Sequence, residues 1–187
     1  MNLVKGFMPV LLFCISVAHL HAQYVFINEF MATNKTTITD EAGNFDDWVE
    51  IYNQGAEAYD ISGKFITDDL TVPDKWQIPY TESAVTVIPP GGYLILWLDG
   101  DEDQGPLHVP FKLSSNGEQI GLFDSDGISV LDSLSFQKQQ SDVSEGRTND
   151  GSPDFTKFNA PSPGKANHTD APEEVAPPYT LSPRGIL

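Results

Sequence analysis

The amino-acid sequence predicts an all-β fold, an antiparallel β-sandwich or barrel, and three observations support this class. Short runs rich in β-branched and aromatic residues alternate with clusters of glycine, proline, asparagine and aspartate. After the N-terminal segment, no stretch combines helical periodicity with helix-capping residues. A hydrophobic content of 40% and an aromatic content of 11% are typical of a globular chain that buries a core.

The expected strands follow one another at the short spacing of a sandwich or barrel. Turn signals separate them at residues 40–44, 89–92, 115–117 and 124–127. The last of these turns contains Asp126-Gly127 and predicts a hairpin between the strands on either side of it. In chain order, the strands are expected at residues 24–30, 47–52, 59–67, 75–78, 84–88, 92–98, 110–113, 119–123, 129–136 and 144–148.

The alternation of side chains predicts which faces of two strands are buried. In residues 47–52, Val49 and Ile51 are expected to face the core, while Glu50 lies on the opposite face. Residues 92–98 are apolar on both faces, as a central strand requires. One face of this strand carries Leu94, Leu96 and Leu98, and the other carries Tyr93, Ile95 and Trp97.

Residues 1–22 have the features of a signal peptide. Lys5 supplies the positive start, residues 6–20 are almost wholly apolar, and Ala22 is a small residue suited to signal peptidase. We expect cleavage after Ala22, so that the single cysteine, Cys14, leaves with the signal. The apolar run is short for a membrane span, and no later segment resembles one. The mature chain is therefore expected to rely on its apolar core, without disulfides or an integral membrane segment.

The rest of the chain is expected to form one domain and a tail. Residues 23–168 are long enough to bury a single core. Residues 169–187 are acidic and proline-rich, which predicts a linker or a disordered tail.

The net charge is −17, from 27 acidic and 10 basic residues, and no basic patch interrupts the acidity. Such a surface repels nucleic acid and anionic membranes, so neither is expected as a partner. Together with the signal, this charge indicates a secreted protein of the periplasm, the cell surface or the medium. The expected partner is a protein or a cell-surface polysaccharide, whose identity the sequence leaves open.

Two strings resemble the opening of the lamin tail domain, INEFMATN at residues 27–34 and DWVEIYN at residues 47–53. Later strings resemble further parts of this family in the family's order, at residues 60–69, 76–79, 88–94, 105–114, 117–122, 132–136, 146–147 and 161–167. The resemblance, closest to exported bacterial members, implies an immunoglobulin-like antiparallel β-sandwich that serves as a binding or structural module. The partners of nuclear lamins do not carry over to an acidic, secreted chain.

The acidic loop at residues 99–105 is the best candidate for a metal site. Calcium prefers several oxygen ligands, so Asp99, Asp101 and Asp103 are predicted calcium ligands. The spacing does not match an EF-hand, because Pro110 stands where the bidentate glutamate would fall. The other interpretation is a solvated acidic loop between strands, and no other cofactor is expected.

Two glutamates in strands need an explanation, since a buried carboxylate requires a partner. We predict that Arg147 pairs with Glu29 or with Glu50 across the sandwich. The alternative is that both glutamates face water.

No catalytic motif stands out, whether a nucleophile elbow, a phosphate loop or a zinc-protease motif. His108 is expected to pack at the entry of a strand and not to act as a base. Large aromatic residues are expected in the core rather than on a sugar-binding surface, namely Trp48, Tyr52, Trp76 and Trp97.

The sequence therefore predicts a secreted, non-catalytic protein-interaction or spacer module of the bacterial envelope or exterior. Two alternatives remain open. One is a calcium-dependent binding module, with carbohydrate as a possible ligand class, and the other is an accessory fragment of a larger exported hydrolase.

Overall fold

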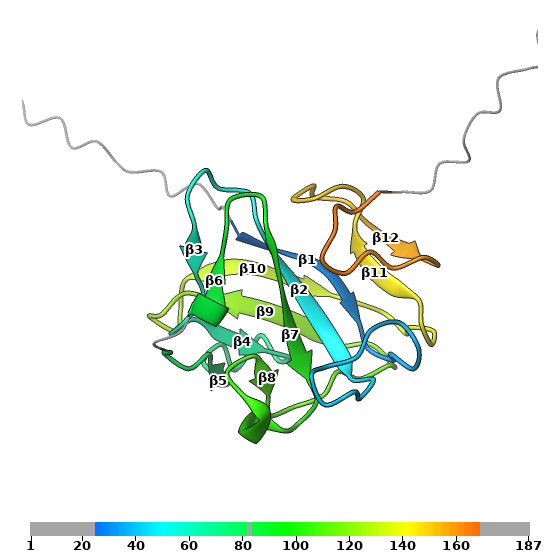
Figure 1. The fold of residues 1–187 in the computed structure, drawn as a ribbon, viewed down its shortest axis with the longest axis horizontal. Coiled ribbons are helices and arrows are strands. Elements are labelled where there is room, and N and C mark those ends of the chain that lie inside the picture. Colours follow the sequence, from blue (N-terminus) through cyan, green and yellow to red (C-terminus); the bar gives the residue numbers. More distant parts are fainter. Residues whose placement is uncertain (1–24, 82–83, 169–187) are drawn as a thin grey trace, which may run out of the picture.

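A computed structural model describes residues 25–81 and 84–168 (Figure 1). The predicted signal peptide at residues 1–22 and the predicted tail at residues 169–187 lie outside this part of the chain. Within the described residues the protein is all-β, which confirms the predicted class, and the elements comprise twelve strands and two short 3₁₀ turns.

Two antiparallel sheets lie face to face and a small ribbon lies beside them (Figure 1). The larger sheet has the order β12-β11-β1-β2-β7-β8, and only the β7–β8 pair is parallel. Its strands are β1 (Val25–Met31), β2 (Asp47–Asn53), β7 (Tyr93–Leu98), β8 (His108–Val109), β11 (Ser144–Arg147) and β12 (Phe155–Phe158).

The smaller sheet has the order β10-β9-β4-β5. Its strands are β4 (Phe65–Thr67), β5 (Trp76–Gln77), β9 (Gln119–Phe123) and β10 (Val130–Ser135). β3 (Tyr59–Asp60) pairs with β6 (Val87–Ile88) in the ribbon, and the 3₁₀ turns are η1 (Ala84–Thr86) and η2 (Glu102–Gln104). The predicted hairpin around Asp126-Gly127 is confirmed, because β9 and β10 pair across it.

Three expected strands differ from the structure. The run at residues 59–67 divides into β3 and β4 of different sheets, because the amide of Lys64 donates to the carbonyl of Ile61 and closes a turn between them. The prediction of a strand at residues 110–113 was wrong. The strand here is β8, which ends before Pro110 because proline has no N–H to donate to a neighbouring strand. The run at residues 84–88 begins as the η1 turn. No strand was expected at β12.

The main core fills the space between the two sheets. Val49 and Ile51 of β2 are fully buried there, as predicted, and Leu96 and Leu98 of β7 join them. The opposite face of the large sheet carries a second cluster, in which Trp48 and Trp97 pack with Met31. The core placement predicted for these two tryptophans is therefore confirmed.

Polar side chains are buried on this opposite face beside the second cluster, where residues 159–168 cover the sheet. Glu29 and Glu50 face each other across β1 and β2 and are both fully buried, so neither faces water. Glu29 accepts hydrogen bonds from the hydroxyl groups of Ser144 and Ser162. Glu50 accepts from Asn28 Nδ2 at 3.0 Å and from the amide of Gly164 at 2.6 Å. These contacts fasten the C-terminal segment onto the sheet.

Arg147 pairs with neither glutamate, and that prediction was wrong. Its Nη2 lies 2.6 Å from Oδ2 of Asp132, a residue of β10 in the other sheet. The register of β10 shifts between Val130 and Asp132, and this bulge is associated with the burial of the Asp132 carboxylate. Asp132 also accepts the amide N–H of Ile27, so the ion pair ties β1, β10 and β11 together.

The stability of the fold is expected to fall as the pH rises through neutrality, because of Glu50. Burial raises the pKa of Glu50 from 4.5 to about 8, against the hydrogen bonds from Asn28 and Gly164, and the nearby charges of Glu29 and Asp150 raise it further. Between these two values the folded protein holds a proton that the unfolded chain has lost. The free energy of unfolding should therefore fall by up to about 1.4 kcal/mol for each pH unit in this window.

Urea denaturation at a series of pH values measures this slope. The Glu50→Gln variant should make this slope shallower, because the amide does not titrate, whereas Glu57→Gln, at an exposed glutamate, should leave it unchanged. A wild-type stability that stays constant or rises across the window would contradict the assignment.

Candidate functional site

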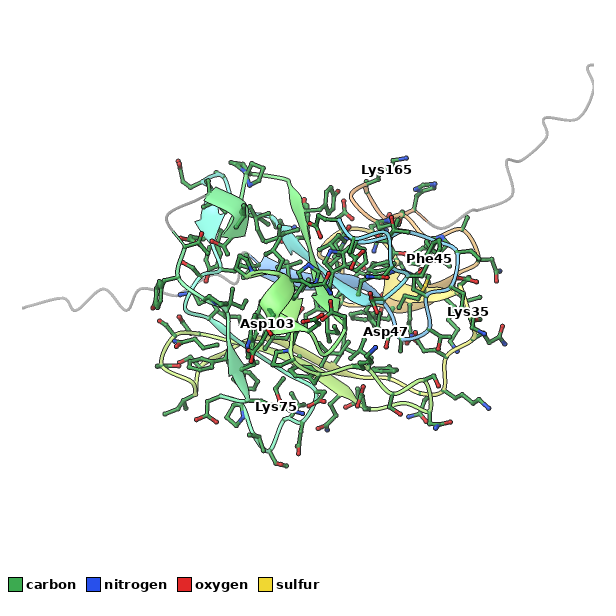
Figure 2. All side chains as sticks on the ribbon, turned by 60° about the horizontal axis from the view of Figure 1, so that its bottom comes forward. Lys35, Phe45, Asp47, Lys75, Asp103 and Lys165 are labelled. Carbon is green, nitrogen blue, oxygen red and sulfur yellow. The ribbon has the colours of Figure 1, made fainter. Side chains whose placement is uncertain are left out.

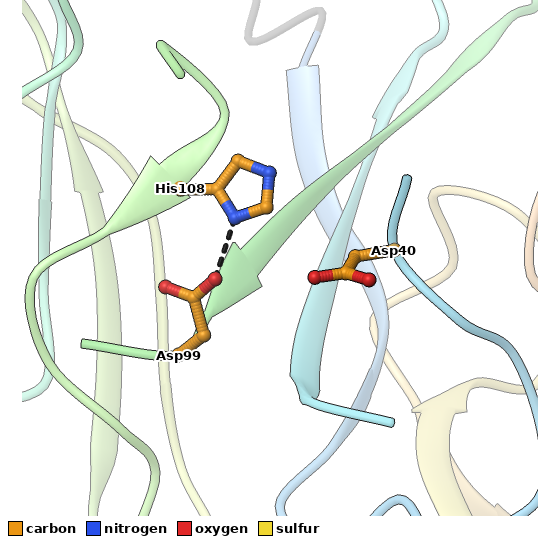
Figure 3. A group of neighbouring side chains, drawn as sticks. All are labelled: Asp40, Asp99 and His108. Atoms are coloured by element: carbon orange, nitrogen blue, oxygen red, sulfur yellow. Dashed lines mark hydrogen bonds and ion pairs between the residues drawn. The ribbon is translucent and has the colours of Figure 1, made fainter. Parts of the chain in front are cut away.

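Two connections meet at one end of the large sheet, and we call the surface formed by residues 40–46 and 99–108, together with the adjoining Val85, the loop end. There Asp40, Asp99 and His108 come together (Figure 3). One ligand atom from each of the three side chains lies within 4.8 Å of the others. The exposed fractions of the three residues are 6%, 7% and 3%, so the cluster is buried.

The parallel pairing of β7 and β8 positions two of these residues. Asp99 directly follows β7, and His108 begins β8 opposite Trp97. Between them, η2 and the turn at Gly105 bring the chain back, and the amide of His108 donates to the carbonyl of Gly105 at 3.1 Å. The amide of Trp97 donates to the carbonyl of Leu107 at 2.8 Å, which fixes the register.

Asp40 reaches the cluster from the connection between β1 and β2. It begins the predicted turn at residues 40–44, where its Oδ1 accepts the amide N–H of Asn44 at 2.7 Å. The amide of Gly43 closes the same turn by donating to the carbonyl of Asp40, and Gly43 has the positive φ of 84° that such a turn requires. The turn therefore holds the carboxylate in place beside His108.

The imidazole of His108 lies between two carboxylates. Its Nδ1 is 2.5 Å from Oδ2 of Asp99, and its Nε2 is 3.3 Å from Oε2 of Glu41. Burial by itself lowers the pKa of His108, but the hydrogen bonds and charges of Asp99 and Glu41 outweigh it and raise that pKa overall. Burial likewise opposes, without overcoming, the hydrogen bonds from Asn44 that lower the pKa of Asp40. The site thus favours positive charge on or near the imidazole.

The structure brings only one of the three predicted calcium ligands into this cluster. Asp99 belongs to it, whereas Asp101 and Asp103 are exposed. Asp103, labelled in Figure 2, lies on η2. The amide of Asp101 donates to Oδ1 of Asp99 at 2.9 Å, as in a turn stabilised by an aspartate side chain. Calcium binding by this loop stays a prediction.

No local signal identifies Asp40 as a site residue, because its sequence context predicts only a turn. His108 does begin a buried strand, as expected, but its contacts with Asp99 and Glu41 were not foreseen. A histidine nine positions after an aspartate carries no motif by itself, and only the return of the chain through η2 brings the two together.

Two hollows adjoin the cluster. One, of about 520 Å³, is mostly polar and is lined by Asn44, Phe45, Asp46, Asp99, Asp101 and Gln104, together with Gly43. The other, of about 460 Å³, is mostly apolar and is lined by Glu41, Ala42, Val85, Pro106, Leu107 and His108, together with Gln104 and Gly105. Phe45 and Val85 are 46% and 43% exposed, so each hollow has an apolar side chain that a ligand can contact. The loop end can therefore accept both polar and apolar groups of a ligand.

The two stacked antiparallel sheets define a β-sandwich module of the immunoglobulin-like class. A family profile described as Lamin Tail Domain matches residues 21–138 of the chain. The protein belongs to the lamin tail domain family, which confirms the resemblance. Comparisons with curated proteins and with solved structures found no match.

Helices long and apolar enough to cross a bilayer are absent from the part of the chain that the structure describes.

Proposed function

We propose that this chain is an exported, non-catalytic binding module of the bacterial envelope or exterior, which holds a protein or polysaccharide partner through its loop end. The observation that carries this proposal is the pair of adjoining hollows with exposed Phe45 and Val85. Membership of the lamin tail domain family supports a module with a structural or binding role. The signal-like residues 1–22 and the net charge of −17 support a location outside the cytoplasm.

The loop end is a better candidate for recognition than the sheet edges. A partner strand needs a long unpaired edge, because main-chain hydrogen bonds supply most of its affinity. Edge strands β5 and β8 have two residues each, and β12 has four. The longest edge strand, β10, has six residues, but a bulge between Val130 and Asp132 interrupts it. The loops, in contrast, offer side chains of several chemical types over two hollows.

Retention on immobilised envelope protein and polysaccharide fractions tests the proposal. Residues 23–187 would be compared with the Phe45→Ser and Val85→Ser variants, each of which changes a partly exposed side chain at one hollow. We expect each variant to reduce retention by about tenfold, as the loss of an apolar contact of about 1.4 kcal/mol does. Ile128→Ser is the matched control, because Ile128 is 77% exposed and lies between β9 and β10. Equal retention of all four proteins would contradict a role for the loop end.

A calcium-dependent module is the second candidate, and one observation favours it. The side-chain amide of Gln104 donates to both Asp99 Oδ2 at 3.4 Å and Asp101 Oδ2 at 3.3 Å, so two carboxylates of the loop converge. Thermal melting with millimolar calcium tests this candidate, since extracellular calcium modules bind in that range. An unchanged melting temperature would remove it.

A further inference from the structure

We propose that Asp40, Asp99 and His108 form a binding site for a divalent transition-metal ion of the zinc class. This site shares only Asp99 with the predicted calcium loop, and it includes an imidazole. The proposal is independent of the partner-binding function, because it concerns the affinity of the protein for the metal alone.

The donor set and its burial fit such an ion. Zinc is bound by imidazole nitrogen and carboxylate oxygen, often by three protein groups with a fourth position open. The three side chains come from the two connections that meet at the loop end, and all are more than nine-tenths buried. Imidazole suits zinc and its neighbours, whereas calcium takes six to eight oxygen ligands.

The negative charge of the carboxylates around His108 favours the binding of a cation. A neutral imidazole carries one N–H, yet both ring nitrogens face carboxylates, those of Asp99 and Glu41. Within the described residues, neither Asp40 nor Asp99 forms an ion pair with lysine or arginine within 4.0 Å. A second proton on the imidazole would offset one of the negative charges, whereas a divalent ion in its place would offset two.

Glu41 occupies the position of an orienting partner. A metal-bound histidine commonly donates its other ring N–H to a carboxylate, which fixes the ring and raises its basicity. Glu41 accepts from Nε2 at 3.3 Å, which leaves Nδ1 to face Asp99. The metal would thus bind at Nδ1.

Backbone amides also hold the carboxylates of Asp40 and Asp99 in place. The amide of Asn44 donates to Asp40 Oδ1 at 2.7 Å, and the amide of Asp101 donates to Asp99 Oδ1 at 2.9 Å. His108 Nδ1 and Asp99 Oδ2 are 2.5 Å apart, so these two atoms must move further apart to admit zinc between them. The required separation is about 3.3 Å, given tetrahedral ligands near 2.0–2.2 Å from the metal. The hollow lined by Asp99 gives the fourth position access to water or to a partner's donor group.

Titration of metal-free protein, residues 23–187, tests the site by calorimetry and thermal melting. We expect one zinc ion to bind per chain, to raise the melting temperature and to release a proton near neutral pH. Asp40→Asn and Asp99→Asn should each weaken zinc binding at least tenfold, and Glu41→Gln should weaken it by about 10–100-fold, as loss of an orienting partner does. The double variant Asp101→Asn, Asp103→Asn is the matched control and should bind zinc like the wild type.

A second measurement leaves Asp40, Asp99 and His108 unchanged, and so it tests the site even if the variants of these residues do not fold. In the His168→Gln protein, His108 is the only imidazole of residues 23–187. Zinc should shift the ring nitrogen resonances of His108 in a ¹H–¹⁵N spectrum, with Nδ1 moving most. No heat and no shift would overturn the proposal. The proposal would also be overturned if the Asp101, Asp103 double variant weakened zinc binding as much as Asp40→Asn does. Stabilisation of the protein by calcium but not by zinc would overturn it as well.

Discussion

Replacing Arg147 with alanine is expected to lower the free energy of unfolding by about 3–5 kcal/mol, the usual cost of removing one partner of a buried ion pair. The loss has several sources. The Nη2 pairs with Asp132 at 2.6 Å, and Nε donates to the carbonyl of Ile27 at 2.9 Å. The guanidinium also lies between two aromatic rings, 5.0 Å from the centroid of Phe26 and 4.8 Å from that of Phe155. Alanine removes all of these contacts and leaves the Asp132 carboxylate buried without a counterion.

Arg147→Lys is expected to recover only part of this loss. An ammonium group cannot make the same fork of hydrogen bonds or lie flat between two rings. Lys112→Ala is the control for an exposed pair, because Lys112 lies 3.9 Å from Asp46 with its side chain 64% exposed. Its expected cost is about 0–1 kcal/mol. Urea denaturation measures all three variants, and an Arg147→Ala cost no larger than that of Lys112→Ala would refute the role of the buried pair.

A chain that ends at residue 143 is expected not to fold, although the match to the family ends earlier, at residue 138. Residues after 143 supply β11 and β12, and β11 pairs directly with β1. They also provide the donors of Ser162 and Gly164 to the buried carboxylates of Glu29 and Glu50. Uncovering the side chains of Glu29 and Glu50 and one edge of β1 at once removes more stabilisation than a small domain has in reserve.

Circular dichroism and thermal melting of residues 23–143 measure this effect. A chain that ends at residue 168 is the control, because it keeps every contact described for the sheet. We expect a cooperative transition in the control and none in the shorter chain. A cooperative transition in residues 23–143 would show instead that the family match coincides with an independent folding unit.

Local patterns were sufficient to predict much of the fold. β9 lies at residues 119–123, as expected, because turn residues bound an apolar run on both sides. The buried faces of β2 and β7 follow from simple alternation, and Val49 and Leu96 both face the main core. These features depend on near neighbours in the chain, which a sequence displays directly.

Long-range pairings could not be predicted in the same way. Arg147 was assigned the wrong partner because its true partner, Asp132, lies at a bulge in β10 that leaves no sequence signal. The cluster around His108 was missed for a related reason, since Asp40 enters it from a distant turn. A carboxylate in a loop has the same local sequence whether it faces solvent or an imidazole.

The place of β1 in the large sheet has a consequence for biosynthesis. Among the described strands β1 is synthesised before the others, yet it is flanked by β2 on one side and by β11, near the end of the domain, on the other. Such a topology has a high contact order, and its closing contacts cannot form before most of the chain has been translated. The nascent domain therefore stays without its finished sheet until most of its residues have left the ribosome.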